Sequence, residues 1–280
     1  IQAVISPLME NLQLQSPAHI YNVLLLLDSY LCKIDDMLGD LNQVLVPILV
    51  ACFQSNHPAL RYEASYIFAS HSIISESLDP ESRYKIITLI LEIITKGNSF
   101  YYGLKVVLEL VQAMENTDCL FELLLPFCLE LINSGKDVNK FGWDILISLF
   151  ELSNNVPEDA SQQMCSYCLE ILKNQPSDGD YISSSIKCIA TLMSKSREVL
   201  VQNIESLNGL FCSFFHNQNL ETKYYILTSL TRFVSIIPNE MTKYLPYFLE
   251  SCFSDLTNFD PISMISQGSF DFMYSNLNWT

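Results

Sequence analysis

The sequence predicts an all-α protein, a right-handed α-solenoid of about six to seven helical pairs. Three observations predict it: apolar segments recur with a period near 40 residues, a second series recurs between them, and turn residues separate the two. The composition agrees, because 49% hydrophobic residues supply a large core and only 8 glycines among 280 residues argue against a turn-rich β protein.

A Leu-Glu pair marks the first helix of each predicted pair. Its copies are Leu91-Glu92, Leu129-Glu130, Leu169-Glu170 and Leu249-Glu250, with spacings of 38, 40 and 80 residues. LNGLFCSFF fills the gap near residue 210, and VPILVACF and SPLMENL continue the series back to residues near 50 and 10. The series therefore predicts seven first helices. Four contain a proline that should bend them: Pro7, Pro47, Pro126 and Pro246.

A second series marks the second helix of each pair. Its members are Ala64, Gly103, Gly142, Ser185 and Tyr224, with spacings of 39, 39, 43 and 39 residues. Four of the five are small, as expected where two helices approach closely. The stretches that follow keep a helical stripe of apolar residues, as Ile186, Ile189 and Met193 do.

Turn residues such as Asn56-His57-Pro58 and Gly97-Asn98-Ser99 separate these helices. We therefore predict one solenoid over 1–280, with approximate repeats 1–35, 36–78, 79–117, 118–156, 157–196, 197–237 and 238–280. Helix pairs with a period near 40 are typical of HEAT or armadillo solenoids. The chain begins without a methionine and neither end resembles a polar cap, so we expect an excerpt of a longer solenoid.

The charge restricts the partners. With a formal charge of −16, the chain has few Lys and Arg residues to neutralise phosphates, so neither nucleic acid nor an anionic membrane is an expected partner. The longest apolar run, Val44 to Phe53, is too short to span a bilayer. Basic proteins are better candidates as partners.

Most of the nine cysteines lie in apolar helical stretches, which predicts reduced thiols and a reducing compartment.

No catalytic motif is recognisable. The sequence has no Walker loop, HExxH or GxSxG, so we expect no enzyme activity, no cofactor and no metal. Cys165 and Cys168 form a CxxC, a spacing that suits zinc or a redox disulfide, but they lie in the middle of a predicted helix without further ligands. Packing in the core is the favoured interpretation, and an enzyme with a cryptic site at this pair is the alternative.

Four residues on second helices are candidates for protein binding. Trp143 beside Asp144 could clamp the aliphatic stem of a basic side chain and pair with its charge. The favoured interpretation is instead that Trp143 is a core residue and Asp144 is solvated. Glu109 and Glu151 would attract basic cargo from the concave face of a solenoid, or else act as ordinary solubilising charges.

One segment, NHPALRYEASYIFA, resembles the HEAT pattern at Pro58, Arg61 and Ala64. The other pairs diverge from that pattern, and the stretch from Leu146 to Asn174, LISLFELSNNVPEDASQQMCSYCLEILKN, is similar to a pair boundary in the importin-4 and importin-5 branch of the importin-β (karyopherin-β) family. The resemblance covers about residues 40–215, with gaps.

This resemblance implies a nuclear import receptor. Such a receptor wraps basic cargo, binds the GTPase Ran and FG nucleoporins, and shuttles between cytoplasm and nucleus. No Ran-contacting residue carries over to this sequence. The alternative is another HEAT scaffold, such as a phosphatase scaffold subunit, an assembly factor or a chromatin regulator, without a transport role.

Overall fold

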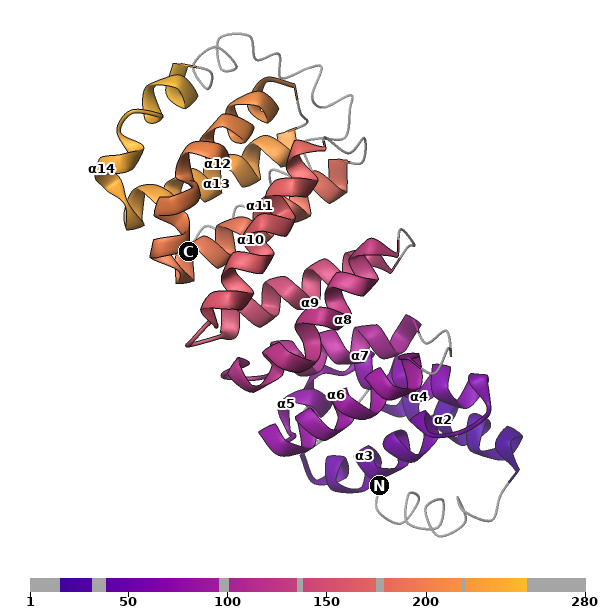
Figure 1. The fold of residues 1–280 in the computed structure, drawn as a ribbon. Coiled ribbons are helices and arrows are strands. Elements are labelled where there is room, and N and C mark those ends of the chain that lie inside the picture. Colours follow the sequence, from indigo (N-terminus) through magenta and orange to yellow (C-terminus); the bar gives the residue numbers. More distant parts are fainter. Residues whose placement is uncertain are drawn as a thin grey trace.

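The computed structural model describes residues 16–31, 39–95, 101–134, 138–174, 179–217 and 220–250. In these ranges the regular elements are helices and no strand occurs, which confirms the predicted all-α class. The helices pack against their neighbours along an elongated stack, an arrangement compatible with an α-solenoid (Figure 1).

The long helices fall into two alternating sets. The set at the positions of the predicted first helices is α3 (Gly39–Phe53), α6 (Pro80–Thr95), α8 (Phe121–Asn133), α10 (Glu158–Lys173) and α12 (Arg197–Asn217). The set at the positions of the second helices is α2 (Pro17–Leu31), α4 (Pro58–Ser70), α7 (Tyr101–Gln112), α9 (Asn139–Leu152), α11 (Gly179–Lys195) and α13 (Leu220–Ile236).

Short elements join some of the long helices: α5 (Ser72–Glu76), the 3-10 helix η2 (Asp118–Leu120) and α14 (Pro238–Met241). The first helix predicted near residue 10 lies outside the described residues, as does the chain after residue 250. Among the described helices, none is long and apolar enough to cross a membrane.

The second helices form a continuous row. Each contacts the next one along the chain, in the order α2, α4, α7, α9, α11 and α13. From α4 onward, each second helix also packs on the first helix that precedes it. Any surface that the second helices share is therefore built from several repeats.

The glycine of the second series at position 142 is needed for close packing. A Cβ atom at Gly142 of α9 would lie 2.8 Å from Ile132 Cγ1 and 3.0 Å from the carbonyl oxygen of Cys128, both on α8. Such distances leave no room for a side chain. The small residue lets α8 and α9 approach each other, as the sequence predicted for this position.

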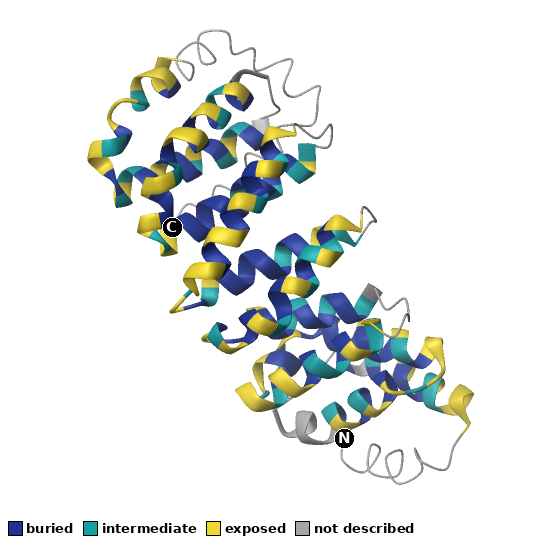
Figure 2. Cartoon of the chain, viewed as in Figure 1, coloured by how far each residue is buried: buried dark blue, intermediate teal, exposed yellow. Residues whose placement is uncertain are grey.

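One connected cluster of buried apolar side chains runs from Val23 to Phe248. Figure 2 shows buried residues in helices along the length of the stack. Because each apolar helix face is covered by adjacent helices, the core is continuous along the stack, as expected for repeats that cannot bury their faces alone. Two of the predicted mid-helix prolines, Pro47 in α3 and Pro126 in α8, lie inside helices of this core.

Polar side chains connect residues that are about one period apart. The Thr117 hydroxyl donates a hydrogen bond of 2.6 Å to the carbonyl oxygen of Leu149. The hydroxyls of Ser183 and Thr222 lie 3.0 Å apart, and both residues are buried. Since buried polar groups require partners, these bonds fix the register between neighbouring helical pairs.

The segment that resembles the HEAT pattern has a local role for each of its three marker residues. Pro58 is the first residue of α4, where the missing N–H of proline costs no hydrogen bond. Arg61 donates a hydrogen bond of 2.7 Å to the carbonyl oxygen of Ser55 in the preceding turn. Ala64 is completely buried. The pattern therefore serves helix entry, the turn and close packing.

Candidate protein-binding site

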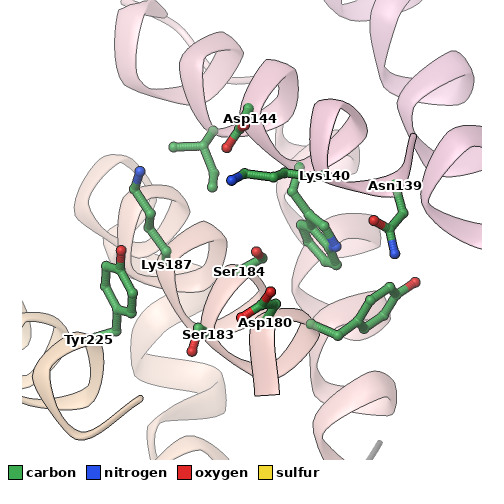
Figure 3. Close-up of a pocket in the computed structure, with 11 residues that line it drawn as sticks. Asn139, Lys140, Asp144, Asp180, Ser183, Ser184, Lys187 and Tyr225 are labelled. Carbon is green, nitrogen blue, oxygen red and sulfur yellow. The ribbon is translucent and has the colours of Figure 1, made fainter. Parts of the chain in front are cut away.

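A pocket of about 410 Å³ lies where three consecutive second helices meet. Asn139, Lys140, Trp143, Asp144 and Ile147 of α9 line it. Its other lining residues are Asp180, Tyr181, Ser183, Ser184 and Lys187 of α11 and Tyr225 of α13 (Figure 3). Because α9, α11 and α13 each supply part of the wall, the pocket exists only when these helices stack.

Trp143 lies in the core at the inner wall of the pocket. Its side chain is only 1% exposed, and its ring packs against Tyr181 with the centroids 5.6 Å apart and against Tyr167 at 6.4 Å. Trp143 is therefore a core residue, in agreement with the favoured interpretation, and its indole is not free to stack on a cation from outside as the clamp would require. Its Nε1–H has no hydrogen-bond partner among the described residues.

Asp144 is partly exposed beside two lysines. Burial raises the pKa of Asp144, and the positive charges of Lys140 and Lys187 partly oppose that rise. Figure 3 shows Asp144 and the ends of Lys140 and Lys187 on the same side of the pocket. No ion pair within 4.0 Å joins Asp144 to either lysine, so the described groups leave its carboxylate only partly compensated.

The other two predicted binding residues lie outside the pocket. Glu109 is half-buried on α7, where burial raises its pKa, Lys105 lowers it and Glu76 raises it. Glu151 is exposed in the last turn of α9. The structure thus brings Trp143 and Asp144 together at one pocket and leaves Glu109 and Glu151 on neighbouring parts of the second helices.

Sequence reasoning missed the basic and aromatic half of the pocket, which comprises Lys140, Lys187, Tyr181 and Tyr225. A signal for Lys187 was present: it follows Ser185 by two residues, as Asp144 follows Gly142, so both occupy the same place in the second series. Lys140 precedes Asp144 by one helical turn. Tyr225 of α13 follows Tyr224 by one residue, as Trp143 follows Gly142, so its place in the second series was a signal too.

The CxxC pair lies in the core. Cys165 is 1% exposed and Cys168 is completely buried, and burial raises the pKa of both thiols, that of Cys165 to about 11. Cys168 packs near Cys188 of α11. Across the described part of the chain, no three His, Cys, Asp or Glu side chains form a group that could hold a metal ion.

The class that fold and pocket define is an all-helical protein, compatible with an α-solenoid, with a pocket on its row of second helices. Comparison of the chain with protein-family models, with curated proteins and with solved structures finds no match.

Proposed function

We propose that the chain is a protein-binding scaffold, a right-handed solenoid of about six to seven HEAT-type pairs that holds a partner along its second helices. The observation that carries this proposal is the pocket shared by α9, α11 and α13. Pockets between stacked helices that combine aromatic walls with a few charged groups are typical binding sites, and the extended face of a solenoid is where such proteins take their partners.

A basic partner suits the charge of the chain. The net charge of −16 steers cationic surfaces toward it over distances of about a Debye length, roughly 8–10 Å at physiological salt. The pocket lining contains two lysines, Lys140 and Lys187, and two aspartates, Asp144 and Asp180. The general attraction for a basic partner therefore comes from the whole chain, and the pocket contributes shape and a mixed set of charges.

Fluorescence anisotropy with a labelled decalysine peptide tests the proposal, with a decaglutamate peptide for comparison. The decalysine peptide should bind and weaken with rising salt, and the decaglutamate peptide should not bind. Ser184→Phe, which fills the pocket without changing its charge, should weaken binding about tenfold or more. The matched control is Ser166→Phe, because Ser166 is exposed on the first helix α10. If both variants bind the decalysine peptide equally well, the pocket is not the binding site.

The narrower form of the proposal is an import receptor of the importin-β family in cytoplasm and nucleus, with basic cargo, Ran and FG nucleoporins as partners. The resemblance at residues 146–174 supports it. A pull-down of the full-length protein with Ran loaded with GTP or with GDP tests it. Selective retention of the GTP form is the expected result. No retention, or equal retention of both forms, would leave another HEAT scaffold, for example a phosphatase scaffold subunit or a regulator of chromatin or complex assembly.

A further inference from the structure

A mostly buried acidic residue, Glu63, lies on the row of second helices, away from the pocket. Glu63 of α4 is only 5% exposed, yet its side chain makes no hydrogen bond or ion pair with the described residues. The carboxylate oxygens of Glu63 are not among the fully buried atoms that lack a partner, so they reach solvent, but burial of the rest of the side chain weakens the solvation of their charge. The position therefore suits a cation supplied from outside the chain.

A second carboxylate near Glu63 adds negative charge to this part of the surface. Asp28 of α2, the helix that packs on α4, acts electrostatically on Glu63, and burial and Asp28 together raise the pKa of Glu63. His71 lies beside Asp28, with its Nε2 atom 3.6 Å from Oδ1 of Asp28. The arginine closest in sequence, Arg61, instead donates its hydrogen bond to the carbonyl oxygen of Ser55.

Three tyrosines, Tyr62, Tyr66 and Tyr102, form an aromatic cluster next to Glu63. Tyr62 and Tyr66 are 47% and 38% exposed. The ring of Tyr102 on α7 lies edge-on to both, with centroid distances of 4.5 Å to Tyr62 and 5.9 Å to Tyr66. Tyr66 follows Glu63 by three residues, so the two side chains leave adjacent positions of the same helix. The charge of Glu63 also acts on Tyr62, whose pKa it helps to raise after the hydrogen bond with Tyr102 and burial.

We propose that Glu63, Asp28 and this tyrosine cluster form a site for an arginine side chain of the partner protein. A guanidinium group can hydrogen-bond two carboxylates through its fork of N–H donors while its flat face stacks on an aromatic ring. Lysine offers a point charge without that planar face, so the site should prefer arginine. This inference rests on the proposed function, because it supplies the chemistry of the bound partner.

Three labelled peptides test the site by fluorescence anisotropy: an eleven-residue Gly-Ser peptide with three arginines, its lysine counterpart and its citrulline counterpart. We expect the arginine peptide to bind at least about threefold more tightly than the lysine peptide, and the neutral citrulline peptide to bind most weakly. Glu63→Gln should weaken the arginine peptide about tenfold, and Tyr66→Leu should reduce the preference for arginine over lysine. Glu130→Gln, at an exposed position of the first helix α8, is the control and should bind normally.

Thermal unfolding of the same variants separates a binding defect from a folding defect. Glu63→Gln removes no hydrogen bond or ion pair with the described residues, so its melting temperature should equal or exceed that of the wild type. Wild-type affinity of Glu63→Gln for the arginine peptide would overturn this inference. If Ser184→Phe weakens the decalysine peptide in that case, the proposed function stands without the arginine site. If none of the basic peptides binds, both proposals fail.

Discussion

The Ser153 hydroxyl donates a hydrogen bond of 2.6 Å to the Asp118 carboxylate, across 35 residues of sequence. The backbone N–H groups of Asn154 and Asn155 donate to the same oxygen at 3.1 Å each. Asp118 thus ties the turn after α9 to the turn before α8. Its role is structural, because it holds two neighbouring helical pairs in register.

Asp118→Ala should lower the free energy of unfolding by about 1–2 kcal/mol, because charge-assisted hydrogen bonds are lost and backbone donors are left to water. Urea denaturation followed by circular dichroism measures it. Glu115→Ala, an exposed position three residues earlier, is the control and should change stability little. A loss no larger than that of the control would contradict the assigned role.

Asp118 also predicts a pH dependence. Partial burial acts to raise the pKa of Asp118, but hydrogen bonds from Ser153, Asn155 and Asn116 outweigh it and lower the pKa from 3.8 to about 2. A depressed folded-state pKa contributes stability that is present above pH 3.8 and is lost as the pH falls through 2. Between pH 4 and 2, the wild type should therefore lose more stability than Asp118→Ala; parallel curves for the two proteins would refute this.

Two glycines should respond to alanine in opposite directions. Gly142→Ala forces a methyl group to within 2.8 Å of Ile132 and 3.0 Å of the Cys128 carbonyl, and should cost about 1–3 kcal/mol. At Gly209 in α12 a Cβ atom would meet nothing within 4 Å, so Gly209→Ala should stabilise by about 0.5–1 kcal/mol. Chemical denaturation of both variants checks the signs, and destabilisation of both would show that the packing argument is incorrect.

The cysteines should differ strongly in reactivity. Cys119 is exposed, whereas Cys165 is buried and burial raises its pKa to about 11. Since the thiolate is the reactive form, N-ethylmaleimide should modify Cys119 long before Cys165 in the native protein. Mass spectrometry of digested, labelled protein measures this order, and a denatured sample gives the reference in which both react. Rapid native labelling of Cys165 would support the cryptic site that the CxxC spacing suggested.

Glu63→Gln should stabilise the protein most near neutral pH. Burial and the charge of Asp28 raise the pKa of Glu63 above 4.5, so the folded state carries a penalty at pH values above that pKa. Below pH 4.5 the carboxyl is protonated in both folded and unfolded states, and the penalty vanishes. The advantage of the variant in urea denaturation should therefore shrink as the pH falls from 7 to 4. If the variant instead gains stability over the wild type as the pH falls, the pKa of Glu63 is lowered by folding and this prediction is wrong.

The sequence by itself determined the helical class, the alternation of two helix types and the close approach at Gly142. These features can be predicted because they are local or periodic. Apolar stripes, turn residues and small residues recur about every 40 positions and indicate which helix faces are buried. The same information placed Cys165 and Cys168 within a helix, and the favoured interpretation of core packing agrees with their burial.

Only the tertiary structure decided which polar side chains share a surface. Trp143 proved to be buried against Tyr181, while Lys140, Lys187 and Tyr225 from three helices joined Asp144 at one pocket. That no side chain in the described part of the chain bonds to Glu63 likewise depends on where α2 and α4 lie. A repeat period determines which helices are neighbours. Which side chains come into contact depends on the rotation of each helix about its own axis, and that rotation follows from the packing of the whole stack.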